Sequence, residues 1–312
     1  MSEKKATREA YGEALAEFGA KYDFLVLDAD LSKSTKTAEF KKVFPERFIN
    51  MGIAEANMMS VAAGMAASGK TVFASSFAMF ASGRAFEQIR NSIAYPHLNV
   101  KIGATHAGIS VGEDGATHQC LEDIGIMRTL PGMTIINPAD AVESRAAVQA
   151  AIEHEGPVYM RFGRLAVPTI FDKETYKFEI GKGIVLSEGT DVSIIATGLL
   201  VPEAIKAGEM LKEKGISAEI INIHTIKPID VELITKTAKK TGAVVTAEEH
   251  NIIGGLGSAV AEVLVENAPV PMERIGTRDV FGKSGKPAPL LKKFGLTAED
   301  IVEKALCVIK KK

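Results

Sequence analysis

The chain has 312 residues, 46% apolar and 24% charged, which is the composition of a globular protein with room for two domains. Lys and Arg number 37 against 39 Asp and Glu, so a net charge of −2 provides no broad positive field for nucleic acid or acidic membranes. The two cysteines, Cys120 and Cys307, are too few for a disulfide framework. Because residues 1–5 are charged and no run reaches about 18 apolar residues, we expect a cytoplasmic protein without a membrane segment.

The first half of the chain alternates segments typical of helices and strands. In chain order we expect a helix at residues 7–18, a strand at 24–28, a helix from 54, a strand at 71–75, a helix at 82–94, a strand at 99–104, a helix at 120–129, a strand at 133–136, a helix at 139–154 and a strand at 158–161. This alternation predicts a doubly wound α/β domain over residues 1–164, with a mostly parallel sheet flanked by helices.

A second α/β domain is predicted for residues 188–312. Residues 165–187 lack a sustained period and are interpreted as a linker. The alternation then resumes, with strands at 192–196, 218–223 and 242–248 and helices at 202–214, 231–241 and 258–266. We therefore expect another mostly parallel, doubly wound sheet.

Two glycine motifs do not predict nucleotide binding. Residues 64–71 satisfy the P-loop pattern G-x-x-x-x-G-K-[ST], but that loop holds phosphate only between a preceding strand and a following helix. Here the expected order is helix then strand, so we interpret Gly69 as a helix C-cap. The glycines at 254–257 lack the third glycine of a dinucleotide fingerprint and predict a tight turn into a helix.

Glu55 begins a helix whose following residues are nearly all small or apolar, so its carboxylate needs a partner. The alternative is a helix-start acid stabilised by the helix dipole. Phe77 and Phe80 follow a strand and could be ordinary core residues. His106 and His118 flank a loop with the sequence Gly-Glu-Asp-Gly, and imidazoles near carboxylates suit proton handling and hydroxyl binding.

Four segments together resemble the cofactor-binding middle domain of transketolases, the thiamine-diphosphate enzymes that move two-carbon ketol units between sugars. They are Gly52-Ile53-Ala54-Glu55, the Phe77/Phe80 connection, Thr105-His106-Ala107-Gly108 and Gly112-Glu113-Asp114-Gly115-Ala116-Thr117-His118-Gln119. The resemblance covers residues 6 to 308. It implies the C-terminal half of that family, a pyrimidine-binding domain followed by a transketolase C-terminal domain.

The resemblance implies roles for the candidate residues. Glu55 would bond the aminopyrimidine ring nitrogen of the cofactor and favour the imino tautomer that removes the C2 proton, and Phe77 and Phe80 would lie against the same ring. His106 and His118 would contact the sugar hydroxyls and the reacting carbonyl. A departure occurs at Gly83, where many transketolases have tyrosine, so we expect Phe86 or a partner chain to rebuild that wall.

The family's substrate-binding residues match further positions. Asp114 would read the hydroxyl configuration at C2, and Arg8, Ser34 and Arg161 match the clamp that holds the sugar phosphate, because arginine pairs with phosphate oxygens bidentately. Arg164 and Lys33 are possible substitutes in that clamp. The remaining histidines, His97, His154, His224 and His250, are interpreted as structural.

One part of the family's site is missing from this sequence. Thiamine-diphosphate enzymes bind the diphosphate through a divalent metal held by Gly-Asp-Gly and a later Asn, and this chain has no Gly-Asp-Gly. The resemblance therefore implies a split transketolase in which an N-terminal partner subunit holds Mg²⁺ or Ca²⁺, and we expect an α2β2 assembly. The small-residue helix at 54–68 suits subunit packing, although it could equally be an internal core helix.

The expected reaction is transfer of a glycolaldehyde unit from a ketose phosphate to an aldose phosphate, as in the pentose phosphate pathway. Three alternatives stay open: a 1-deoxyxylulose-5-phosphate synthase-like enzyme, a 2-oxoacid dehydrogenase β chain, and a non-catalytic paralogue that binds a ligand or partner. The synthase usually has arginine where this chain has His106, and the β chain lacks the Glu-Asp-Gly-Ala-Thr-His-Gln run. The sequence does not fix the sugar pair, and branched or sulfonated sugars also fit.

Overall fold

Seven short apolar strands form the first sheet of the computed structural model, which describes residues 4–312. Their order is β12-β6-β7-β5-β4-β2-β3, and every pairing is parallel except that of β12 with β6. The strands are β2 (Phe24–Asp28), β3 (Phe48–Asn50), β4 (Thr71–Phe77), β5 (Val100–Thr105), β6 (Thr134–Ile136), β7 (Val158–Arg161) and β12 (Thr225–Lys227). Because helices cover both faces, the central strands are apolar almost throughout, as in other parallel sheets.

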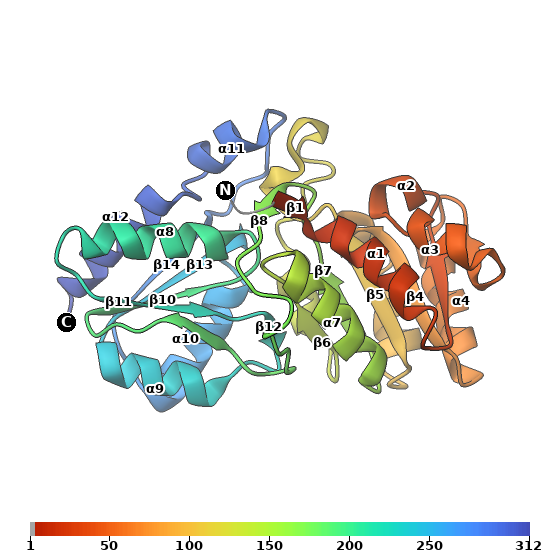
Figure 1. Cartoon of the computed structure of the whole chain (residues 1–312), viewed down its shortest axis with the longest axis horizontal. Coiled ribbons are helices and arrows are strands. Elements are labelled where there is room, and N and C mark those ends of the chain that lie inside the picture. Colours follow the sequence, from red (N-terminus) through yellow and green to blue (C-terminus); the bar gives the residue numbers. More distant parts are fainter. Residues whose placement is uncertain (1–3) are drawn as a thin grey trace.

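Helices pack on the two faces of this sheet. On one face α1 (Thr7–Phe18) lies against α7 (Ala141–Glu153), over an aromatic core that includes Tyr11 and Phe73 (Figure 1). On the other face α4 (Glu55–Ala67) presents methionines and alanines to the sheet. Shorter helices join these elements: α2 (Ser32–Thr35), α3 (Ala38–Val43), η1 (Pro45–Arg47), η2 (Met79–Arg84), α5 (Phe86–Gln88), η3 (Ile89–Ala94), η4 (Ile109–Asp114) and α6 (Asp123–Arg128).

The second sheet has the order β14-β13-β10-β11-β9, and only β9 runs antiparallel to its neighbour. Its strands are β9 (Ile184–Ser187), β10 (Val192–Ala196), β11 (Ala218–Asn222), β13 (Val244–Asn251) and β14 (Met272–Thr277). Figure 1 shows α8 and α12 on one face and α9 and α10 on the other. The helices are α8 (Leu200–Lys212), α9 (Val231–Thr241), α10 (Leu256–Asn267), α11 (Pro287–Lys293) and α12 (Ala298–Ile309).

The segment predicted as a linker contains two strands, and strand pairing also connects the two units. Within residues 165–187, β8 (Ala166–Pro168) pairs with β1 (Lys4–Ala6), and β9 is the edge strand of the second sheet. In return, β12 from the second half of the chain extends the first sheet. One apolar cluster also runs from α4 to α9 and α10. The units are therefore packed together through both apolar contacts and strand pairing.

The predicted fold class, two mostly parallel sheets flanked by helices, is confirmed. Among the predicted helices, 82–94 differs most, because its backbone forms π-turns on either side of α5. The helix expected at 120–129 begins only at Asp123. The predicted order around the P-loop pattern is confirmed, since α4 ends at Ala67, Gly69 has φ +86° and β4 follows. Gly254, with φ +83°, likewise lies in the turn before α10.

No helix within residues 4–312 combines the length and the apolar character that a bilayer span requires.

Candidate active site

The candidate residues come from the strand ends and following segments at one edge of the first sheet. Parallel strands point their carboxyl ends to the same edge, so the segments after β2, β3, β4, β5 and β7 meet there. These segments carry, in chain order, Ser34, Glu55, Phe77 and Phe80, His106 to His118, and Arg164. The fold therefore collects at one place residues that are up to 130 positions apart.

Glu55 is the first residue of α4 and has its carboxylate inside the protein. The residue is 1% exposed, and Ser76 Oγ donates a hydrogen bond of 3.2 Å to Oε1. Oε2 lies 2.7 Å from Nη1 of Arg84. A buried carboxylate with a charged partner differs from a solvated helix-start acid, because burying such a charge is costly without a partner.

Arg84 is a site residue that the sequence did not single out. Its guanidinium lies 4.6 Å from the centre of the Phe80 ring, so it covers one aromatic face while pairing with Glu55. The neighbouring Gly83 was the departure from the family pattern, and an added Cβ there would lie 2.4 Å from Cε of Met79. Phe86, which was one of the two expected replacements beside a partner chain, packs against the apolar core. The nearest sequence signal was the unusual glycine one residue earlier.

The two phenylalanines and the two histidines form one aromatic cluster. Phe77 and Phe80 have ring centres 6.0 Å apart with planes 19° from parallel. His106 stacks on Phe77 at 3.8 Å, and His118 meets the edge of Phe80 at 5.3 Å. Phe77 is buried and Phe80 is half-buried, so Phe80 also has surface available to a ligand. The two phenylalanines and the two histidines, which the sequence analysis placed in one site, thus lie in one cluster.

His106 is held in a neutral form. Burial lowers the pKa of His106 to about 3, and the neighbouring positive charges of Arg8 and Arg164 act in the same direction. Arg8 Nη1 donates to its Nε2 at 3.2 Å, which places the ring proton on Nδ1, facing Thr105 Oγ1 at 2.9 Å. A neutral imidazole in this place can exchange hydrogen bonds with hydroxyl groups at physiological pH.

Arginines gather at one end of the cluster. Besides contacting His106, Arg8 donates a 2.7 Å hydrogen bond to the main-chain oxygen of Ser34. Arg164 donates to the main-chain oxygen of Val111 and lies 3.9 Å from the carboxylate of Asp114. The loop with Ser34 is fixed by buried Asp28, which accepts hydrogen bonds from residues 31, 35 and 37. Two guanidinium groups beside a fixed loop form a site suited to a phosphate or sulfonate group.

Arg161, which was predicted for the phosphate clamp, contacts Asp123 and main-chain oxygens and none of these clamp residues within residues 4–312. It is 3% exposed, and its Nε pairs with Asp123 at 2.8 Å. Burial alone would lower the pKa of Arg161, but the Asp123 carboxylate outweighs it and raises that pKa. Its side chain is buried with Asp123 at the end of β7, whereas that of Arg164, three residues later, is 37% exposed and faces Asp114. Arg164 was the substitute named from the sequence.

Asp114 lies in an exposed turn. Its side chain is 42% exposed and faces Arg164, and Glu113 lies 3.5 Å from the same guanidinium. The segment is therefore accessible to a substrate that enters along the arginines.

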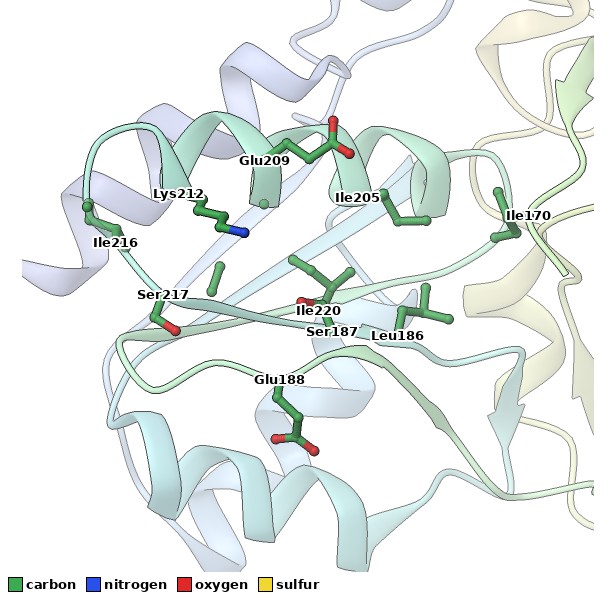
Figure 2. Close-up of a pocket in the computed structure, with 13 residues that line it drawn as sticks. Ile170, Leu186, Ser187, Glu188, Ile205, Glu209, Lys212, Ile216, Ser217 and Ile220 are labelled. Carbon is green, nitrogen blue, oxygen red and sulfur yellow. The ribbon is translucent and has the colours of Figure 1, made fainter. Parts of the chain in front are cut away.

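A groove in the second unit and three further histidines lie away from the candidate residues. A groove of about 690 Å³ lies in the second unit between α8 and the strands β9 and β11, and Figure 2 shows apolar side chains such as Ile205 and Leu186 facing into it. None of the candidate residues lines it. His154, His224 and His250 have protein hydrogen-bond partners away from the cluster. Within residues 4–312, no three acidic, histidine or cysteine side chains gather as metal ligands would.

The residues around Glu55 fit the pyrimidine end of thiamine diphosphate. A buried carboxylate oxygen can accept a hydrogen bond from a ring nitrogen, and the accessible face of Phe80 offers flat apolar surface. At present both groups are in contact with Arg84, a side chain that is 51% exposed and long enough to move. These residues would hold the pyrimidine ring.

Comparisons with known proteins match both units. The family model described as transketolase, pyrimidine binding domain, matches residues 3–169, and transketolase, C-terminal domain, matches residues 181–301. A putative transketolase C-terminal section from Methanocaldococcus jannaschii is 56% identical over 98% of this chain and 97% of its own. A 6-deoxy-6-sulfo-D-fructose transketolase subunit from Clostridium is 48% identical over 98% and 95%.

Full-length and solved relatives extend this comparison. The transketolase of Rattus norvegicus is 39% identical over 97% of this chain, which corresponds to 49% of the rat protein. A solved structure described as a split-gene transketolase in an inactive β4 tetramer superimposes with a TM-score of 0.92, at 56% identity over 98% of both chains.

Proposed function

The chain belongs to the transketolase family, and on that basis we propose that it is the C-terminal subunit of a split, thiamine-diphosphate-dependent transketolase. The reaction is transfer of a two-carbon ketol unit from a ketose phosphate to an aldose phosphate. The observation that carries this proposal is the buried carboxylate of Glu55, which pairs with Arg84. Arg84 lies over the ring of Phe80, and that ring contacts His118. A non-catalytic paralogue would have no reason to keep these groups together.

The geometry supports separate proposed roles for the cofactor and for the residues around it. When bound, the cofactor supplies the carbanion chemistry, and Glu55 holds its pyrimidine ring by a hydrogen bond. Phe77 and Phe80 provide the apolar wall of that site. Neutral His106 exchanges hydrogen bonds with the sugar hydroxyls, and the half-buried His118 contacts the hydroxyls and the reacting carbonyl.

A second polypeptide completes the proposed enzyme. The chain corresponds to about half of the rat transketolase, and the Gly-Asp-Gly metal segment is missing from its sequence. The related split-gene protein is described as inactive when it forms a β4 tetramer. We therefore assign the diphosphate and its Mg²⁺ or Ca²⁺ to an N-terminal partner subunit, in an α2β2 assembly.

The proposed substrates are sugars with an anionic end. Arg8, which is bonded to the main chain of Ser34, and Arg164 would provide the positive charge, and Asp114, which faces Arg164, would contact a hydroxyl group. One relative is named for a sulfonated sugar, 6-deoxy-6-sulfo-D-fructose. Intermediates of the pentose phosphate pathway are the first donors to test, followed by sulfonated and branched ketoses.

The test is reconstitution. The chain is co-purified with a candidate partner of about 270 residues that carries Gly-Asp-Gly, with thiamine diphosphate and Mg²⁺, and ketol transfer is followed by a coupled assay over several donors. Transfer by the mixture, and none by either chain alone, supports the proposal. Decarboxylating condensation of pyruvate with glyceraldehyde 3-phosphate would instead indicate the synthase. Binding of the partner without turnover of any donor would indicate the paralogue.

A further inference from the structure

The loop that carries His106 and His118 has a backbone that needs support. His106 has φ +56°, a left-handed conformation that costs a non-glycine residue on the order of 1 kcal/mol or more. Gly108, Gly112 and Gly115 follow with φ values of +85°, +86° and +77°. Such a loop keeps one shape only when its surroundings fix it.

Glu249, from β13 of the second unit, fixes the start of this loop. It is 3% exposed, and its Oε1 accepts a 2.6 Å hydrogen bond from the main-chain nitrogen of Ser110. Its carboxylate also lies directly against Gly108, where an added Cβ would come within 2.3 to 2.5 Å of the carboxylate atoms. The contact therefore needs both the glycine at 108 and a side chain of the length of glutamate at 249.

Arg161 fixes the position of Glu249 itself. Its Nη2 donates to the main-chain oxygen of Glu249 at 2.9 Å and to that of Cys120 at 3.3 Å. Arg161 is also paired with Asp123 of the first unit. Through Arg161, the end of β13 that carries Glu249 is therefore bonded to residues that follow the histidine loop. The backbone of Glu249 is thus fixed by Arg161, and its carboxylate contacts Ser110 from that fixed position.

The far end of the loop has a matching contact. Gln119, next to His118, donates from Nε2 to the main-chain oxygens of Ile109 and Gly112 within the loop, and to that of Lys283 in the second unit. Figure 1 shows this yellow loop beside the blue segment that leads into α11. Both histidines therefore lie in a segment whose two ends are bonded to the second unit.

We propose that Glu249 is a positioning residue, through which the second domain sets the loop that presents His106 and His118 to the substrate. Its catalytic consequence depends on the proposed function, whereas its effect on the loop does not. Glu249 touches none of the groups assigned to the cofactor, so its influence is on the sugar-binding side of the site. This gives the second domain, which provides none of the candidate catalytic residues, a defined part in the reaction.

Matched variants separate positioning from general stability. Glu249→Asp shortens the side chain by one methylene and withdraws the carboxylate from Ser110, whereas Glu249→Gln keeps an oxygen acceptor at the same reach. Glu248→Asp is the control, because Glu248 is equally buried but accepts from Leu256 and Gly257 at the start of α10. All three are conservative enough to be compared as folded proteins.

Two measurements test the proposal. In hydrogen–deuterium exchange of the full chain, Glu249→Asp should speed exchange of amides 106–119 on the order of tenfold, while Glu249→Gln and Glu248→Asp leave them near wild type. In the reconstituted enzyme, Glu249→Asp should lower kcat about 100-fold, the scale of a small misplacement, with the thiamine diphosphate Kd within about twofold. Unchanged loop exchange in Glu249→Asp, or equal changes in Glu248→Asp, would overturn the proposal. A reconstituted wild type without ketol transfer would count against the proposed function, and the exchange result would still decide the role of Glu249.

Discussion

Arg84 Nη1 lies 2.7 Å from Oε2 of Glu55, so the carboxylate assigned to the cofactor already has a charged partner within its own chain. The same guanidinium lies over the Phe80 ring. In the proposed function the pyrimidine ring takes a place beside both groups, which requires Arg84 to move or to share the carboxylate. The Arg84–Glu55 pair therefore stabilises the free subunit and also occupies the carboxylate that would bind the cofactor ring.

Removing that partner should destabilise the free chain. Arg84→Met leaves Glu55 buried with only the Ser76 hydrogen bond. Because Arg84 is half exposed and water can partly replace it, we expect the free energy of unfolding to fall by about 1–2 kcal/mol in urea denaturation. Arg90→Met is the control, since Arg90 is exposed and bonds only its neighbour Asn91. Equal stability of the two variants would show that the Glu55 carboxylate does not depend on Arg84.

The anion clamp can be tested by two arginines that lie three residues apart. Arg164→Ala should raise KM for phosphorylated donors about tenfold or more, because it removes charge-assisted hydrogen bonds far from the bond that breaks. KM for unphosphorylated hydroxypyruvate should change little. A similar rise for both donors would remove Arg164 from the clamp.

Arg161→Ala should act on stability instead. It leaves Asp123 buried without its charged partner, and breaking a buried pair in this way costs about 3–5 kcal/mol. We expect a large fall in the urea midpoint, measured on the chain alone. A stable Arg161→Ala protein with a raised KM for phosphorylated donors would instead place the residue in the clamp.

The buried His106 should make the chain less stable in mild acid. Its pKa is about 3 in the folded chain and about 6.5 when unfolded, so below pH 6.5 only the unfolded state takes up the proton. Stability from this residue is fully present above pH 6.5 and falls by about 2 kcal/mol by pH 5. The measurement is the free energy of unfolding in urea, for wild type and His106→Gln, at a pH above 6.5 and at pH 5. A wild type that loses no more stability than the variant would contradict this environment for His106.

The sequence predicted much of the fold because strand and helix periods in this chain are regular. The strands β2, β7 and β10 and the helices α1 and α9 begin and end where their patterns do. The π-turns on both sides of α5 were missed because they share the apolar spacing of an ordinary helix. Strand β12 was missed because three residues carry no period, and its place in the first sheet is set by long-range contacts.

Site residues that lie in a sequence motif could be predicted, whereas those brought to the site only by tertiary packing could not. Glu55, Phe77 and the two histidines lie in recognisable segments, and the fold brings them to one edge of the sheet. Choosing between Arg161 and Arg164 required the tertiary structure, because Arg161 is occupied by Asp123 and by the main-chain oxygens of Cys120 and Glu249. Glu249 had no sequence signal, since its contacts come from the packing of two domains.

The most direct test of the account is thiamine diphosphate binding and ketol transfer by Glu55→Ala in the reconstituted enzyme. We expect the wild-type mixture to bind the cofactor and transfer ketol units, and Glu55→Ala to lose at least about a hundredfold in kcat, the scale of one positioned acid–base group. Glu87→Ala, an exposed glutamate on α5, should behave as wild type. Near-normal turnover by Glu55→Ala would contradict the assignment of this carboxylate as the group that holds the cofactor ring.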